Sequence, residues 1–216
     1  MNFKSKIIVL LLALSCSIAK AQFVKKHGQL SVKGTQLVDK NQNPIVLRGV
    51  SLGWHSIWPR FYNQKTVAWL KKDFNCTIVR AAMGIEIGAH PYIKEPQFSE
   101  DKIESVIKGA IKSDIYVIID WHSHNINLEE AKEYFDKISK KYGKYPNVIY
   151  EVFNEPDYET WPEVKAYSEE IIKVIRANDP DNIILVGSPK WDQEVHLPAQ
   201  DPIKGYDNLM YTMHFY

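Results

Sequence analysis

No hydrophobic run in the sequence is long enough to cross a membrane. The most apolar segment, residues 7–14, is far shorter than the roughly 20 apolar residues that a spanning helix requires. Lys4 and Lys6 precede this segment, and the small residues Ala19 and Ala21 follow it. A positive region, a short apolar region and an A-x-A site are typical of a secretory signal peptide, which we expect to be cleaved after Ala21. The sequence therefore predicts a secreted or periplasmic protein that has no membrane partner once the signal is removed.

Cysteine is also scarce, with only Cys16 and Cys76 in the chain. Cys16 lies inside the predicted signal peptide, residues 1–21. A lipoprotein signal ending at Cys16 is an alternative, although Ala13 stands where such signals usually carry leucine. Cys76 is the only cysteine of the mature sequence, which excludes an internal disulfide. Because it opens an apolar run, we expect a buried thiol rather than a reactive one.

An excess of charge of one sign is missing as well. The 27 basic and 26 acidic side chains leave a net charge of +1, which gives no reason to expect a nucleic-acid or anionic-membrane partner. A neutral polymer fits this balance better, and aromatic residues are abundant, with six Trp and twelve Tyr. Low-complexity linkers do not interrupt residues 22–216, so we expect one monomeric domain there.

Short apolar strands alternate with longer amphipathic helices along this domain. The turn residues Gly28, Gly34 and 39–44 first predict a small β-hairpin. Apolar strands separated by helices then indicate a parallel sheet that is covered on its faces. The predicted strands are 45–50, 77–83, 115–120, 148–153, 183–187 and 209–214, and the predicted helices are 64–73, 100–113, 128–142 and 161–177.

The ends of the strands separate the two folds that fit this alternation. A doubly wound sheet usually carries a glycine-rich first turn, and none is present. Nearly every strand instead ends in polar or aromatic residues, which in a (β/α)8 TIM barrel all meet at one face. We therefore predict an α/β fold of the barrel type. The sequence contains about six predicted strands, whereas a closed barrel has eight. We therefore expect an incomplete barrel that stops after strand six. The strand-end residues are Ser51, Trp54, Arg80, Asp120, Trp121, His122, Asn154, Glu155, Trp191, His214, Phe215 and Tyr216.

The segment Asn154-Glu155-Pro156 ends the fourth predicted strand. A carboxylate at the mouth of a buried strand can have a raised pKa, as a general acid requires. Asn154 can hydrogen-bond a sugar hydroxyl beside the reacting carbon, and Pro156 stops the strand. The alternative is a surface glutamate that only ends a strand. Glu151, four residues earlier, is interpreted as structural.

Histidines and tryptophans near the strand ends have two interpretations each. His122 and His124 share a strand face and could bind a metal, but no convincing ligands occur on other strands. We therefore predict a sugar-binding His122, no metal and no cofactor.

Indole rings stack on the apolar faces of glucose units, although core packing is the common alternative for any one of them. The indoles expected at this face are Trp54, Trp58, Trp121 and Trp191.

Five motifs, in order and at βα spacing, resemble glycoside hydrolase family 5, in particular its bacterial endoglucanase branch. The resemblance covers nearly all of residues 26–216. Gly84 departs from it, because the family often has an aromatic residue there, and this leaves the distal sugar subsites open. The motifs are Leu-Arg-Gly-Val-Ser (47–51), Ile-Val-Arg-Ala-Ala-Met (78–83), Tyr-Val-Ile-Ile-Asp-Trp-His (116–122), Asn-Glu-Pro (154–156) and Met-His-Phe-Tyr (213–216).

The resemblance implies a role for each matched residue. Glu155 is the proton donor and then the general base, and Asn154 binds the sugar 2-hydroxyl. Arg80 orients the nucleophile, a glutamate at the end of a seventh strand that lies beyond this sequence. Retaining chemistry requires that glutamate roughly 5 Å from the acid. His122 and His214 line the central subsite, and Tyr216 is bonded to the nucleophile. From their positions at the strand ends, Trp58 and Trp191 are also predicted to bind substrate.

The implied activity is that of a secreted retaining endo-β-1,4-glucanase that acts on soluble or amorphous glucan without a cofactor. Two alternatives stay open. One is a β-mannanase or a related hemicellulase, which shares the chemistry. The other is a carbohydrate-binding protein that has no catalysis because the nucleophile is absent.

Overall fold

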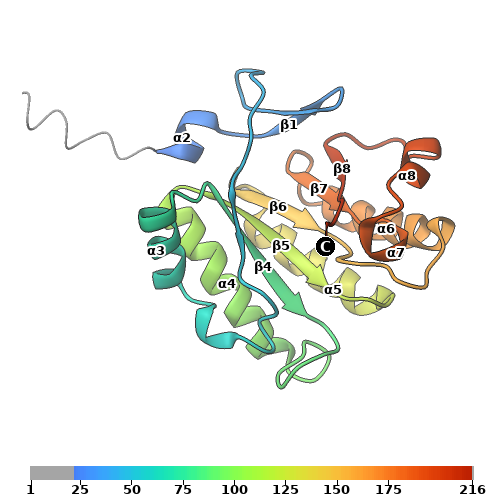
Figure 1. The fold of residues 1–216 in the computed structure, drawn as a ribbon, viewed down its shortest axis with the longest axis horizontal. Helices are drawn as coiled ribbons and strands as arrows, with labels where there is room; N and C mark the ends of the chain where they lie inside the picture. The colour runs from blue at the N-terminus through green and yellow to red at the C-terminus, as the bar shows by residue number, and fades with distance from the viewer. Residues whose placement is uncertain (1–21, 216) are drawn as a thin grey trace, which may run out of the picture.

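Six parallel strands, hydrogen-bonded in chain order, form the central sheet of this computed structural model, which describes residues 22–215 (Figure 1). The predicted signal peptide, with Cys16, and the predicted site residue Tyr216 lie outside the described residues. All six predicted strands are present. They are β3 (Gly49–Ser51), β4 (Ile78–Gly84), β5 (Tyr116–His122), β6 (Val148–Glu151), β7 (Ile183–Val186) and β8 (Leu209–Tyr211).

The order of the strands excludes a doubly wound sheet for this part of the chain. Such a sheet reverses its strand order at one point. Here the order β3-β4-β5-β6-β7-β8 follows the chain without a reversal, as in a barrel. Since β3 and β8 are the two edges of the sheet, residues 22–215 form a barrel that is open on one side.

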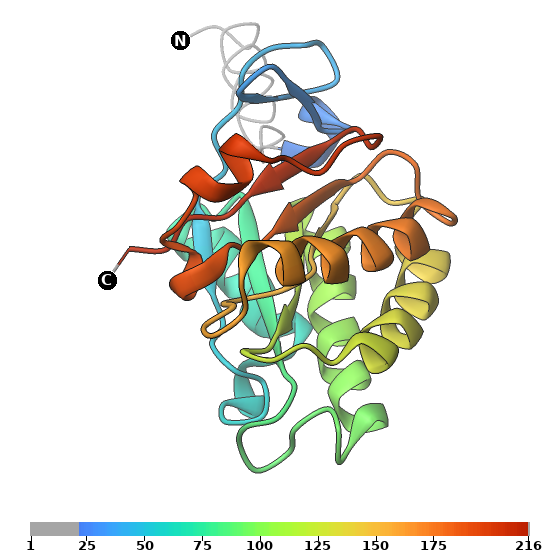
Figure 2. The ribbon, with the colours of Figure 1, turned by 90° about the vertical axis from the view of Figure 1, so that its right-hand side faces the viewer.

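Four long helices connect the strands from β3 to β7 and lie along one face of the sheet (Figure 2). Local signals set their ends. Asn63 caps the first helix by accepting a hydrogen bond from Thr66 N at 3.0 Å, and Thr160 and Glu163 form a capping box at the last. The helices are α3 (Gln64–Phe74), α4 (Pro96–Ser113), α5 (Leu128–Tyr142) and α6 (Trp161–Arg176). Shorter helical segments are α2 (Phe23–His27), η1 (Pro59–Phe61), α7 (Pro189–Asp192) and α8 (His196–Gln200).

The predicted N-terminal hairpin is confirmed and covers the amino end of the sheet. Strands β1 (Ser31–Lys33) and β2 (Gln36–Val38) pair antiparallel around Gly34, whose φ of 62° favours glycine. The Tyr116 hydroxyl, at the start of β5, donates to Gly28 O at 2.7 Å. Because the hairpin occupies this end, the carboxyl end of the sheet, where the polar strand ends gather, stays uncovered by it (Figure 1).

Between the helices and the sheet lies one large apolar core. Val79, Ile119 and Phe135 are fully buried within it. Cys76 is also buried, as expected from its apolar run, and burial raises the pKa of its thiol. Among residues 22–215, no helix combines the length and the apolar character that crossing a bilayer requires.

Four strands are shorter than predicted: β3, β6, β7 and β8. For the two edge strands, β3 and β8, the structure shows a local cause. The first was expected over 45–50, but Ile45 N donates to Leu37 O of the hairpin, so that pairing within the sheet begins only at Gly49. The last was expected to reach His214. The chain instead leaves β8 after Tyr211, and His214 N donates to Asp192 O at 3.4 Å.

Candidate active site

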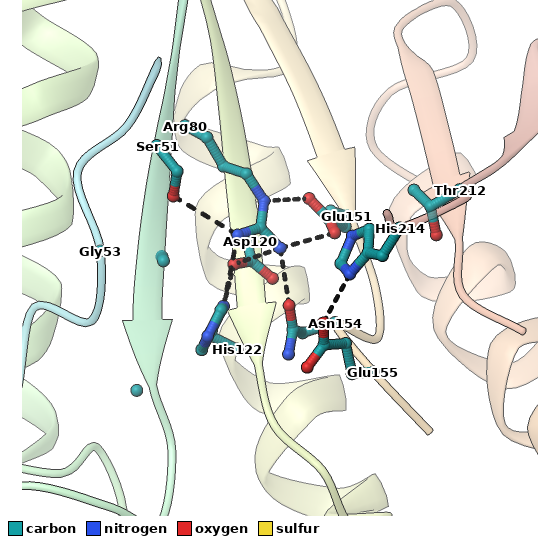
Figure 3. A network of polar contacts seen from close by, with 12 residues as sticks. Ser51, Gly53, Arg80, Asp120, His122, Glu151, Asn154, Glu155, Thr212 and His214 are labelled. Carbon is teal, nitrogen blue, oxygen red and sulfur yellow. Dashed lines mark hydrogen bonds and ion pairs between the residues drawn. The ribbon is translucent and has the colours of Figure 1, made fainter. Parts of the chain in front are cut away.

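Arg80 is the centre of a buried polar cluster at the carboxyl end of the sheet (Figure 3). In the strand register, Ser51 on β3 lies opposite Arg80 on β4, and Asp120 on β5 lies opposite Glu151 on β6. Arg80 donates from Nε and Nη2 to the two Glu151 carboxylate oxygens, both at 2.7 Å. Its Nη2 also lies 2.9 Å from Asp120 Oδ2 and donates to Asn154 Oδ1 at 2.8 Å. Residues of β5, of β6 and of the segment after β6 therefore fix one guanidinium.

Two carboxylates share that single positive charge. Burial raises the pKa of Asp120 to about 7 and also raises the pKa of Glu151, while Arg80 opposes both shifts. Burial alone would lower the pKa of Arg80, but Asp120 and Glu151 outweigh burial and hold that pKa above its ordinary value. The cluster keeps Arg80 charged, and its two buried carboxyl groups hold a proton more readily than exposed ones do.

His122 presents a neutral imidazole at this site. Its Nδ1 lies 2.6 Å from Asp120 Oδ2, and since a carboxylate accepts hydrogen bonds, Nδ1 carries the hydrogen. Burial and the nearby charge of Arg80 lower the pKa of His122 to about 3. At neutral pH its Nε2 therefore carries a lone pair, which can accept a hydrogen bond from a hydroxyl group.

Asn154 follows β6 and is buried, with 1% of its surface exposed. Because Arg80 occupies Oδ1, the orientation of the amide is fixed. Its Nδ2 has no hydrogen-bond partner among the described residues. Leaving a buried donor unpaired costs about 1–3 kcal/mol, so the site favours a ligand oxygen at this position.

Glu155 lies where the chain leaves β6 and passes the end of β5. Its backbone N–H donates to Ser123 O at 3.3 Å, and its side chain is 15% exposed. Carboxylate oxygen Oε1 lies 2.6 Å from His214 Nδ1, and Oε2 lies 3.9 Å from His124 Nε2. Two imidazole rings from different elements thus flank the carboxyl group, which gives it partners for holding and releasing a proton.

Three of the four expected indoles lie near this site or at the surface. Trp58 and Trp191 are 46% and 40% exposed. Trp54 packs its edge on His122, with ring centroids 4.4 Å apart, and stacks on His124 at 5.8 Å. Exposed or partly exposed indoles of this kind can stack on sugar rings.

The expectation for Trp121 is wrong. Its side chain is fully buried and packs against Tyr92 and Tyr134 in the apolar core. The alternation of a strand explains this, because Asp120 and His122 face the site and the residue between them must face the helices.

Comparison with known proteins decides the family. The model of the cellulase family (glycosyl hydrolase family 5) matches residues 38–216. The chain belongs to this family. It is 41% identical over 205 residues to an endoglucanase of Clostridium saccharobutylicum, covering 92% of this chain and 45% of the relative. It is 44% identical over 193 residues to Endoglucanase Z of Dickeya dadantii, covering 87% and 45%.

Solved structures give the same result. One from Cytophaga hutchinsonii superimposes with a TM-score of 0.86 at 45% identity, covering 89% of this chain and 63% of that one. The catalytic domain of endoglucanase Cel5A from Thermobifida fusca superimposes with a TM-score of 0.83 at 33% identity, covering 89% and 66%. These cellulases are (β/α)8 barrels, so the predicted fold class is confirmed. The chain spans about half the length of the curated relatives that it matches.

The structure gives the positions of seven predicted site residues. Five of them meet at the carboxyl end of the sheet, and two indoles lie exposed. The five are Arg80, His122, Asn154, Glu155 and His214, and the indoles are Trp58 and Trp191.

Sequence reasoning assigned no role to three groups of this site, although it listed Asp120 among the strand ends. Asp120 is in the same strand motif as His122, and the period of two would have placed both on one face. His124 was considered only as a possible metal ligand. It lies in the loop after β5, where its Nδ1 donates to Glu155 O at 3.1 Å and its ring faces the Glu155 carboxyl group. Asp192 gave no signal at all, because only the tertiary fold brings it to His214.

The two histidines that raised the metal alternative have separate partners. His122 is bonded to Asp120, and His124 is bonded to the Glu155 backbone. Among residues 22–215, no three or more His, Cys, Asp or Glu side chains are grouped so that they could hold a metal ion.

Proposed function

We propose that the complete protein is a retaining endo-β-1,4-glucanase with Glu155 as its acid/base. The observation that carries the proposal is the position of Glu155 at the carboxyl end of β6, between His214 and His124 and next to the unpaired amide donor of Asn154. The relatives named above are endoglucanases, and a variant of the Thermobifida fusca enzyme was solved in complex with cellotetraose. Both facts favour a β-glucan substrate.

The chemistry needs two proton transfers at one carboxyl group. Glu155 first protonates the glycosidic oxygen while a carboxylate nucleophile attacks the anomeric carbon from the other face. The Glu155 carboxylate then takes a proton from a water molecule, which displaces the nucleophile and restores the original configuration. By the family resemblance, the nucleophile is a glutamate after a seventh strand, and Arg80 keeps it oriented. Proton transfer of this kind requires no cofactor.

Sugar binding uses the polar groups around the acid. The Nδ2 of Asn154 donates to the 2-hydroxyl of the reacting sugar, and Nε2 of His122 accepts from a neighbouring hydroxyl. Trp58 and Trp191, which are exposed, stack on the apolar faces of further glucose units. We propose a monomer that acts outside the cytoplasm, secreted or periplasmic, because residues 1–21 have the pattern of a signal peptide.

The activity is tested with the complete protein on carboxymethylcellulose and on galactomannan. We expect release of reducing sugars from the first and little from the second. The anomer formed first, followed by NMR, should have the β configuration if the reaction retains configuration. A preference for galactomannan would identify a mannanase. Binding of cello-oligosaccharides without any cleavage would identify a carbohydrate-binding protein.

A further inference from the structure

Asp192 is a buried carboxyl group close to Glu155 that has no role in the mechanism above. Its side chain is fully buried. The Ser188 N–H donates to Oδ1 at 2.6 Å, and the Thr212 hydroxyl donates to Oδ2 at 2.5 Å. Oδ2 also lies 3.5 Å from Nε2 of His214. His214 therefore lies between two carboxyl groups, with Nε2 facing Asp192 and Nδ1 facing Glu155.

The backbone around Asp192 is unusual. Lys190, Trp191 and Asp192 have φ values of 56°, 54° and 60°, a left-handed conformation that non-glycine residues adopt at a cost. The conformation buries Asp192 and leaves Trp191 exposed. Trp191 N donates to Pro156 O at 3.0 Å, and Asp192 O accepts from His214 N at 3.4 Å. The strained segment thus ties the loop after the acid to the chain after β8.

Along the chain Asp192–His214–Glu155, the contacts of 3.5 and 2.6 Å can share two hydrogens in three ways. In the first, His214 Nε2–H donates to an ionised Asp192, and a protonated Glu155 donates to Nδ1. In the second, a protonated Asp192 donates to Nε2, and Nδ1–H donates to an ionised Glu155. In the third, a cationic His214 carries both hydrogens between two ionised carboxyl groups. All three arrangements have the same net charge, and only the first has the acid in the form that starts the reaction.

We propose that Asp192 is a positioning residue that determines, through His214, whether Glu155 holds its proton. This rests on the proposed function of Glu155. The 3.5 Å separation between Asp192 and His214 does not oppose the role, because catalytic hydrogen bonds are often long in free enzymes and shorten with substrate.

Competition between the two carboxyl groups is supported by their surroundings. Burial raises the pKa of Asp192 to about 8, against the hydrogen bonds from Thr212 and Ser188, so Asp192 holds a proton in the same pH range as a general acid.

Other titratable or charged groups also act on this chain. They come from β4, β5, β6 and the loop after β5. Because they stay in place when Asp192 is changed, a shift of the pH profile or of the His214 tautomer in the variant is due to Asp192. They are Arg80, Asp120, Glu151 and His124.

The substitution Asp192→Asn is the direct test. The Ser188 N–H needs an oxygen acceptor, which places the new amide oxygen at Oδ1 and the NH2 group at the position of Oδ2. That NH2 group donates to His214 Nε2 and fixes the second arrangement, with Glu155 ionised. Since a positioned general acid contributes about 10²–10⁴-fold, we expect kcat/KM on cellotetraose at pH 7 to fall about tenfold or more. The basic limb of the pH profile should move to lower pH.

The leaving group separates this role from general damage. On 2,4-dinitrophenyl β-cellobioside, whose leaving group needs no proton, Asp192→Asn should retain nearly the wild-type rate. Asp179→Asn is the matched control, because Asp179 is equally buried but is bonded to Tyr150 and Asn182, on the far side of the sheet from the acid. Asp179→Asn should lower the stability of the protein and leave the ratio of the rates on cellotetraose and on the aryl cellobioside unchanged.

Nitrogen NMR of the His214 ring gives a readout independent of activity. We expect the Nε2–H form of the ring to be populated in the wild-type protein, alongside forms with a hydrogen on Nδ1, and Nδ1–H alone in Asp192→Asn. If Asp192→Asn does not fold, Thr212→Val offers a second test, because it removes one donor to Asp192. It should shift the His214 ring tautomer and the ratio of the rates on the two substrates in the same direction, while Thr212→Ser should not. The proposal would be overturned if Asp192→Asn kept the wild-type ring tautomer and lost kcat/KM equally on cellotetraose and on 2,4-dinitrophenyl β-cellobioside. A wild-type protein that cleaves neither substrate would instead refute the glucanase function and leave the NMR result to decide the role of Asp192.

Discussion

Individual atoms of Glu155 are held by groups from two segments, the loop after β5 and the chain after β8. Oε1 meets Nδ1 of His214 at 2.6 Å, Oε2 faces Nε2 of His124, and the backbone is bonded to Ser123. Changing Glu155 to Ala or Gln removes both proton transfers. Because general acid–base catalysis and the retaining mechanism both depend on them, we expect turnover of natural glucans by the complete protein to fall by roughly 10²–10⁴-fold or more.

The controls for Glu155 follow from the same chemistry. Substrates with good leaving groups should lose less in the first step, and azide should rescue the Ala variant by replacing water as the nucleophile. Glu163→Gln is a suitable control, since Glu163 is exposed and only caps α6. Near-normal cellulose hydrolysis by Glu155→Ala would show that another residue is the acid.

Arg80 carries a second prediction at this scale, and it concerns stability. In Arg80→Met, the buried carboxyl groups of Asp120 and Glu151 lose their guanidinium partner, so their folded-state pKa values, already raised by burial, rise further. A carboxyl group whose pKa is higher in the folded than in the unfolded protein does not destabilise the fold below its unfolded-state pKa, near 4. The destabilisation grows as the pH rises towards the folded-state pKa. We expect a loss of about 3–5 kcal/mol at pH 7 and a clearly smaller loss at pH 4.

Urea unfolding of the complete protein at several pH values measures this difference. Arg176→Met is the control, because Arg176 is also largely buried but donates to the backbone oxygens of Asp179 and Asp207. The loss of unfolding free energy in Arg176→Met should vary much less with pH. A pH-independent loss in Arg80→Met would mean that the cluster is already neutralised in another way.

Part of the site was predictable from single residues, and the reason is topological. Parallel strands end at one edge, so the polar residues at the ends of β5 and β6 had to meet there, and His122 and Glu155 do. Arg80 lies within β4, and its side chain reaches the same cluster. Asp192 was not predictable, because its contact with His214 depends on three left-handed residues in succession. No propensity or period of the sequence signals such a segment.

At the scale of elements, the end of β4 packs closely against the loop before η1. A methyl group added at Gly84 would lie 2.3 Å from Ser56 Oγ and 3.0 Å from Cε3 of Trp54. The loop would have to move, and with it the indoles Trp54 and Trp58. For Gly84→Ala we expect a loss of about 1–3 kcal/mol from overpacking and a higher KM for long cello-oligosaccharides, with a smaller effect on aryl cellobiosides.

A matched control for this change lies in α4. A methyl group at Gly109 would be 3.0 Å from Gln64 Cα of the neighbouring helix, away from the site. Gly109→Ala should therefore lower the urea midpoint without changing KM. An unchanged KM in Gly84→Ala would show that the loop holding Trp54 and Trp58 does not contribute to glucan binding.

The long elements were predicted well, and the short ones were not. Helix α5 (Leu128–Tyr142) has the predicted limits, since its apolar face repeats over four turns between polar segments. The short segments α2, η1, α7 and α8 have five residues or fewer and are too short to show a period. Strand limits at the two edges were wrong because other partners, the hairpin and Asp192, take the backbone groups there.

At the scale of the whole molecule, export predicts where the mature chain begins. A signal peptide of residues 1–21 leaves Gln22 as the first residue. N-terminal sequencing of the protein from the culture medium or periplasm should therefore read from Gln22. A start at a lipidated Cys16 would instead show a lipoprotein.

The two open edges of the sheet predict how residues 22–216 behave when expressed alone. Strands β3 and β8 carry unpaired backbone groups, and such edges promote association between chains. Near the β3 edge and on α3, large apolar side chains are exposed: Val46, Val50, Trp69 and Phe74, at 66%, 42%, 50% and 60%. Exposed apolar groups of this kind favour aggregation. We therefore expect this segment to be poorly soluble, which light scattering after refolding would show.

The same segment should also be inactive on cellulose. Retention needs two carboxyl groups roughly 5 Å apart on opposite sides of the bond, and the expected nucleophile belongs to a seventh strand. Reducing-sugar release from carboxymethylcellulose should stay at background, while the complete protein provides the positive control. Measurable activity would place a second catalytic carboxylate within residues 22–216. Asp120, Asp157 and Glu86 would then be the first to replace, and Asp120 is the least suited of them, because Arg80 and His122 already occupy Oδ2 and its side chain is fully buried.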